Sequence, residues 1–155
     1  MPGDEQFLQQ AIDLAVANVC DAGGRPFGAV VVKDGEVIAT GVNEIGATGD
    51  PTAHAELSAI RRAAKVLGAP RLDGCVIYAS GQPCPMCLSA MYLTGVSGVR
   101  FAYSNADGEP FGLSTASIYD ELAKPLEHQA LDVRHQPPAD PAQEAPYAVW
   151  KSRQA

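Results

Sequence analysis

No apolar run in the 155-residue sequence approaches the length that a membrane crossing needs, so we do not expect a membrane-spanning protein. The four cysteines are too few for the disulfide framework of a small secreted domain. The first residues, MPGDEQ, are acidic and lack the basic and apolar regions of a signal peptide. We therefore expect a cytoplasmic protein.

Positive charge is also scarce in this chain. There are 11 Lys and Arg residues against 18 Asp and Glu, which gives a net charge of −7 and an isoelectric point near 4.8. The basic residues are scattered, with Arg61 and Arg62 adjacent, whereas proteins that bind nucleic acid usually gather them on one face. We expect no nucleic-acid partner, and a small uncharged substrate fits this composition better.

The composition, 46% hydrophobic and 19% charged, is that of a globular protein. The length suits a single domain, residues 1–155. The apolar periodicity and its flanking stop signals predict helices over residues 4–22, 52–67, 84–94 and 116–123, and a short one near the carboxyl terminus. Apolar and alternating runs predict strands over residues 28–33, 36–42, 75–80, 98–104 and 131–135.

These predicted elements alternate in a way that favours an α/β fold. Asp34 and Gly35, between the first two strands, are a strong signal for an antiparallel hairpin. Strands and helices then alternate, which predicts a three-layer α/β/α sandwich with a mixed sheet of about five strands. We expect Cys20 and Cys75 to be core thiols.

The stretch GQPCPMC, residues 81–87, has the spacing of a metal site. Cys84 and Cys87 are three residues apart, so both sulfurs share one face if a helix begins there. The flanking prolines favour that start, and the unpaired N–H groups and the helix dipole stabilise thiolates. With His54 of the TAHAE stretch they supply three zinc ligands, which leaves a fourth position for water, as in catalytic sites.

Glu56 completes the predicted site. In mid-helix, residues two apart point in different directions, so His54 and Glu56 converge only if the site lies beyond the helix end. A carboxylate in that position can take a proton from water activated by zinc and hand it to a substrate. Zinc nucleobase deaminases have this H-x-E and P-C-x-x-C pattern, with a glutamate that is not a ligand.

Other interpretations explain parts of this pattern. A CxxC after an apolar strand is also typical of thioredoxin-like redox pairs, but that leaves the TAHAE stretch unexplained. A closed structural zinc site needs a fourth protein ligand. His54 alone is more often a structural histidine, and Glu56 alone a solvated or capping residue. The four residues together favour a hydrolytic zinc site.

The chain resembles the cytidine deaminase-like zinc deaminase superfamily and, within it, the small bacterial guanine deaminases. The resemblance runs from Phe7 to Trp150. The stretches that carry it are PFGAVVVKDG, Asn43, DPTAHAE, AIRRAAKVLGA, PCPMC and SIYDELAKP.

This resemblance implies a zinc-dependent aminohydrolase that converts guanine to xanthine and ammonia, with Zn²⁺ as cofactor and Glu56 as the catalytic residue. It assigns Asn43 to hydrogen bonding with the ring edge, Phe27 to stacking and the Ala55 N–H to a carbonyl or ring atom. Pro83 and Thr115 join the expected substrate-binding residues. Without the resemblance, Asn43 reads equally well as a turn residue and Phe27 as a core residue.

The chain differs from the guanine deaminases at positions that are expected to determine which substrate is bound. It has Ser114 and Thr115 in place of an acidic pair, and Gly81 and Gln82 in place of Cys-Glu. Its end lacks the aromatic residue that closes the site in that family. Guanosine, cytosine, cytidine or an aminotriazine therefore stay open as substrates, and a tRNA-adenosine deaminase is a more distant alternative.

The carboxyl-terminal segment, residues 137–155, begins with a proline-rich connector and carries Tyr147 and Trp150 on one predicted helix face. Packing on its own domain is the simplest interpretation of this pair. The resemblance implies instead that the segment crosses to a partner subunit, and we expect a domain-swapped homodimer.

Overall fold

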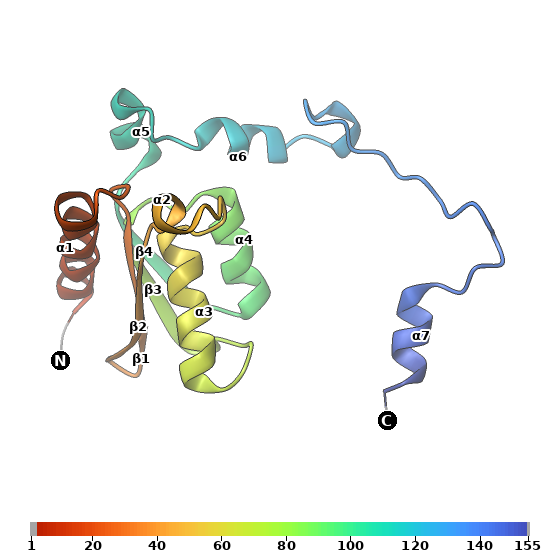
Figure 1. The fold of residues 1–155 in the computed structure, drawn as a ribbon, viewed down its shortest axis with the longest axis horizontal. Coiled ribbons are helices and arrows are strands. Elements are labelled where there is room, and N and C mark those ends of the chain that lie inside the picture. The colour runs from red at the N-terminus through yellow and green to blue at the C-terminus, as the bar shows by residue number, and fades with distance from the viewer. Residues whose placement is uncertain (1–2, 155) are drawn as a thin grey trace. The chain divides into compact units, whose positions relative to one another are not determined.

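The computed structural model describes residues 3–154, and the chain forms two compact units that divide after Asp120 (Figure 1). The first unit contains α1 (Asp4–Ala22), β1 (Gly28–Lys33), β2 (Glu36–Val42), α2 (Ile45–Thr48), α3 (Ala55–Leu67), β3 (Cys75–Gly81), α4 (Pro85–Thr94), β4 (Gly98–Tyr103), α5 (Asn105–Gly108) and the 3-10 turn η1 (Glu109–Phe111). Helix α6 (Ala116–Leu122) spans the division, and the second unit contains η2 (Leu126–His128) and α7 (Pro146–Ser152).

A mixed sheet organises the first unit, with the strand order β2-β1-β3-β4. Strand β1 pairs antiparallel with both β2 and β3, and β3 pairs parallel with β4. At the hairpin, Asp34 and Gly35 have φ angles of 51° and 78°, the left-handed pair that a tight turn between twisted strands requires. The predicted hairpin is confirmed.

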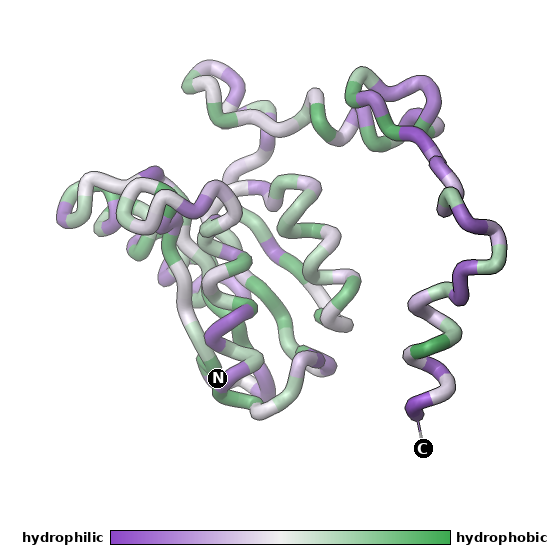
Figure 2. Tube along the Cα trace, turned by 45° about the vertical axis from the view of Figure 1, so that its right-hand side comes forward, coloured by the Kyte–Doolittle hydropathy of each residue, from purple (hydrophilic) through white to green (hydrophobic). Residues whose placement is uncertain are grey.

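Helices cover both faces of this sheet. Val30, Val32 and Tyr78 point to one face, where they pack against Phe7 and Ala11 of α1. The alternate strand residues point to the other face and pack against α3 and α4; they include Ala29, Val31 and Ile77. Figure 2 shows hydrophobic residues along these central strands. The three-layer α/β/α sandwich is therefore confirmed.

Two expectations from the sequence are wrong. The sheet has four strands, because residues 131–135 form no strand and their apolar side chains, Leu131 and Val133, are exposed instead of lying on a sheet face. Cys20 is exposed, because it falls outside the buried stripe of α1 that Phe7 and Ala11 define. Cys75 is buried, as expected.

The two helices with the predicted metal ligands begin later than the sequence suggested. Helix α3 starts at Ala55 and not at residue 52, because the Asp50 carboxylate accepts the Thr52 N–H (2.8 Å) and holds the chain in a turn. Helix α4 starts at Pro85, and Cys84 is its N-cap. Within residues 3–154 no helix has both the length and the apolar character that a membrane crossing would demand.

Candidate functional site

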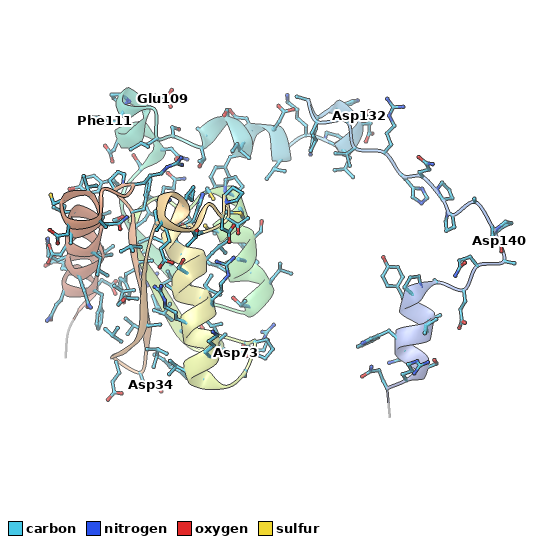
Figure 3. The ribbon with its side chains drawn as sticks, in the orientation of Figure 1. Asp34, Asp73, Glu109, Phe111, Asp132 and Asp140 are labelled. Carbon is cyan, nitrogen blue, oxygen red and sulfur yellow. The ribbon has the colours of Figure 1, made fainter. Side chains whose placement is uncertain are left out.

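The predicted metal ligands lie at the starts of α3 and α4. His54 is the N-cap of α3 and Cys84 the N-cap of α4, and both have an extended backbone, with ψ angles of 155° and 165°. Asp34 and Asp73, labelled in Figure 3, lie at the opposite end of the sheet. Both helices pack on one face of the sheet, so residues distant in sequence meet at one point.

Three ligand atoms converge there. The Nδ1 atom of His54 lies 3.4 Å from the Cys84 sulfur and 3.6 Å from the Cys87 sulfur. All the ligand atoms lie within 4.8 Å of one another, and among the described residues no other group of three His, Cys, Asp or Glu is close enough to hold a metal ion. Nitrogen and sulfur donors in this number fit Zn²⁺ and leave one coordination position open.

The two thiols and His54 change one another's pKa values. Hydrogen bonding from Cys87 lowers the pKa of Cys84 to about 4, and the same interaction raises the pKa of Cys87. The hydrogen bond between the side chains of His54 and Cys84 also raises the pKa of His54. Cysteine binds a metal as its thiolate, so metal binding at this pair would release protons and would depend on pH.

Glu56 lies in the first turn of α3 and is 5% exposed. Burial raises the pKa of its carboxyl group, since the charged form is poorly solvated there. A carboxyl group with a raised pKa can hold and release a proton closer to neutral pH than an exposed one. The arrangement places a buried, ionisable carboxyl group beside the ligand cluster.

Close packing of β2 and α3 fixes the position of these residues. A Cβ atom on Gly41 of β2 would lie 2.3 Å from the Ala55 carbonyl oxygen and 2.6 Å from the Ala59 nitrogen. Glycine therefore permits the helix backbone to approach the strand. The start of α3, which carries His54 and Glu56, therefore packs directly against β2.

A cavity of about 180 Å³ opens onto the ligand cluster. Its lining consists of Arg25, Phe27, Asn43, His54, Ala55, Glu56, Gln82, Cys84, Gly112, Leu113, Ser114 and Thr115. The structure thus brings Phe27, Asn43, Ala55 and Thr115 to the same cavity as Glu56. Pro83 does not line it; its carbonyl accepts a hydrogen bond from the Tyr119 hydroxyl, and its contact with substrate stays a prediction.

Several lining residues were not predicted as substrate contacts. Gln82 and Ser114 had a signal in the sequence, because they stand where the resembling family has acidic residues. Arg25 lies in the loop before β1, and Gly112 and Leu113 follow η1; no pattern in the sequence pointed to them. The folding of the chain brings these loop residues to the cavity.

A family model matches the first two thirds of the chain. Residues 1–103 match the family model for the cytidine and deoxycytidylate deaminase zinc-binding region. The chain belongs to this deaminase family. It is therefore a zinc-dependent hydrolytic deaminase, and His54, Cys84 and Cys87 are positioned to hold the metal. The predicted resemblance and cofactor are confirmed.

Several members of this deaminase family are similar over most of the chain. Guanine deaminase of Bacillus subtilis (strain 168) is 47% identical over 127 residues, which cover 82% of this chain and 81% of the relative. The X-ray structure of guanine deaminase from Bacillus subtilis aligns with a TM-score of 0.89 and 41% identity, over 97% of this chain and 95% of that one. A tRNA-specific adenosine deaminase of Aquifex aeolicus is 39% identical over 128 residues, 82% of each protein.

Proposed function

We propose that this protein is a guanine deaminase, which hydrolyses guanine to xanthine and ammonia. The observation that carries the proposal is the buried Glu56 carboxylate beside the three-ligand cluster in a cavity of about 180 Å³. Sites for larger, drug-sized ligands usually measure about 300–1,000 Å³, so a single heterocyclic base suits this one. The 47% identity to a guanine deaminase supports the choice of base.

In the reaction, water adds to the ring carbon that carries the amino group, and ammonia leaves. His54, Cys84 and Cys87 would hold the zinc ion, which would supply a nucleophile near neutral pH by lowering the pKa of water. Glu56 accepts one proton from water and passes it to the adjacent ring nitrogen. It then accepts the second proton from the hydroxyl that has been added to the ring carbon and passes it to the departing amine, so that ammonia leaves and a carbonyl forms. Its burial and raised pKa suit both the acceptance and the return of a proton.

Three residues on the cavity wall are proposed to orient the ring. The Ala55 N–H is in the first turn of α3, where backbone donors have no partner within the helix and can reach a ligand. Asn43 is 5% exposed, and its backbone N–H donates to the Phe27 carbonyl (3.2 Å). The Phe27 ring, half-buried in the same wall, provides a stacking surface.

The test is ammonia release from the zinc-loaded protein, measured with guanine, guanosine, adenine, cytosine, cytidine and ammeline. We expect guanine to give the highest kcat/KM. A higher kcat/KM for any other compound would overturn the assignment to guanine, although the deaminase family would stand. A tRNA anticodon arm belongs in the panel because of the 39% identity to a tRNA-specific deaminase, but the net charge of −7 opposes binding of a polyanion.

We also propose a homodimer in which residues 137–155 cross to the partner subunit. Tyr147 and Trp150 on α7 support the proposal, because these large aromatic side chains are exposed in the single chain. Light scattering should give twice the chain mass of 16.2 kDa, and deletion of residues 137–155 should reduce the particle to one chain. A particle of 16.2 kDa for the intact protein would contradict the dimer. A cytoplasmic location stays a prediction.

A further inference from the structure

Residues 112–115, which follow η1, form the outer wall of the cavity beside Glu56. From Ser104 to Asp120, on both sides of this outer wall, no residue is buried. The large apolar side chains of the same stretch, Phe111, Leu113 and Ile118, are exposed. Little apolar surface therefore holds the outer wall to the rest of the protein, and its position depends on hydrogen bonds.

Asn105 supplies the first of two links to the outer wall. Its backbone N–H donates to the Oε1 atom of Gln82 (2.8 Å), and its own Oδ1 atom accepts the backbone N–H of Thr115 (3.2 Å). A capping box of Ser104 and Asp107 at the start of α5 fixes the backbone at this point. Asn105 therefore joins the outer wall to the stretch that precedes α4.

Tyr119 of α6 supplies the second link. Its hydroxyl donates to the carbonyl of Pro83. A carbonyl can only accept, so the phenol must be the donor in this bond. Asn105 and Tyr119 lie before and after the outer wall in sequence, and Gln82 and Pro83 are adjacent. The two links thus attach both ends of the outer wall to one short stretch, which leads directly into Cys84, the N-cap of α4.

We infer that Asn105 and Tyr119 are positioning residues for the deamination, because they hold the outer wall in place beside a bound ring. Neither residue lines the cavity, so each acts through the residues that it holds. A wall that is already in place costs less to order when a substrate binds, whereas a loosened wall leaves only a fraction of the molecules ready to bind. The inference rests on the proposed deaminase site but not on the choice of base.

Hydrogen exchange tests the two links without a substrate. Loss of one hydrogen bond should raise the opening equilibrium of the residues that it holds about 2- to 10-fold. We expect amide exchange in residues 105–119 of the zinc-loaded protein, measured by mass spectrometry, to rise by this factor in Tyr119→Phe and in Asn105→Ala. Asn105→Asp keeps the oxygen that accepts the Thr115 N–H and should exchange as slowly as the wild type. Exchange equal to that of the wild type in Tyr119→Phe or Asn105→Ala would refute the role of the residue changed.

Steady-state kinetics test whether the links serve the reaction. The substrate is the compound of the panel with the highest kcat/KM. We expect KM to rise at least about threefold in Tyr119→Phe and in Asn105→Ala with little change in kcat, because the outer wall is in place once the substrate is bound. Asn105→Asp should restore the KM of the wild type. Tyr92→Phe, at an exposed position of α4, is the matched control and should change neither KM nor exchange. An unchanged KM in a variant whose residues 105–119 exchange faster would overturn the inference.

Zinc content separates this role from an effect on the metal. Tyr119 bonds to the carbonyl that directly precedes Cys84, so loss of the bond could displace a metal ligand instead. We expect full zinc content by atomic emission in every variant. Loss of zinc together with kcat in Tyr119→Phe would overturn the role at the outer wall. If no compound of the panel releases ammonia, the proposed function fails, and hydrogen exchange alone decides whether the two links hold the outer wall.

Discussion

Replacement of Glu56 by glutamine removes the proposed proton carrier and changes little else. The two side chains are nearly equal in volume, and Glu56 is not one of the three clustered metal ligands. Because burial raises the pKa of Glu56, its charged form costs folding free energy at neutral pH, and the neutral amide does not. We therefore expect Glu56→Gln to fold, to bind zinc and to keep its melting temperature.

The expected loss of turnover can be worked out from the cavity. General acid-base catalysis by a positioned side chain contributes about 10²- to 10⁴-fold. No second carboxylate lines the cavity among the described residues, so nothing in it can take over the proton transfer of Glu56. We expect kcat to fall by the whole factor, which corresponds to about 3–5 kcal/mol of transition-state stabilisation.

The assay is ammonia release under saturating substrate, with the zinc content of the same preparation measured by atomic emission. His54→Ala is the control for metal loss, since it removes a ligand and should reduce zinc content and turnover together. A Glu56→Gln protein with full zinc content and turnover within tenfold of the wild type would refute the proton-carrier role of Glu56.

Three further changes test the metal cluster and the scaffold. Cys87→Ser should lower zinc content and turnover together, since a thiolate ligand is lost; full zinc content by atomic emission would contradict the ligand assignment. Gly41→Ala should destabilise the fold by about 1–3 kcal/mol in urea, because a new Cβ atom would lie 2.3 Å from a backbone oxygen of α3, whereas Gly46→Ala, with no atom within 4 Å, should be neutral. The hydrogen bond from the Tyr78 hydroxyl lowers the pKa of Asp4 in the folded protein below the ordinary value of 3.8. The ionised Asp4 therefore stabilises the fold above pH 3.8, and this stabilisation is lost as the pH falls through the folded pKa. The free energy of unfolding in urea, measured at pH 7 and pH 3, should fall less on acidification in Asp4→Asn than in the wild type.

Prediction from sequence worked best where a local pattern has one physical solution. The Asp34-Gly35 turn and the alternation of Val30 and Val31 fix the hairpin and its two faces, and both appear in the structure. Prediction failed for residues 131–135, because an alternating run becomes a strand only if a sheet edge accepts it. Cys20 was misplaced because its burial depends on where the rest of α1 faces.

The sequence by itself determined the chemistry of this protein. Two short motifs at the starts of helices contain His54, Glu56, Cys84 and Cys87. Their spacing allows few arrangements other than a zinc site with a carboxyl group beside it. Each motif lies at the start of one helix, so the spacing within the motif is enough to place its side chains relative to one another.

Only the tertiary structure decided what surrounds that chemistry. Arg25, Gln82 and Thr115 come from three separate connections, and they share a cavity because the sheet order brings those connections together. The direction in which Gln82 offers its amide depends on one backbone N–H, that of Asn105, 23 residues away in sequence. Such contacts arise from packing between distant segments, which no local pattern encodes.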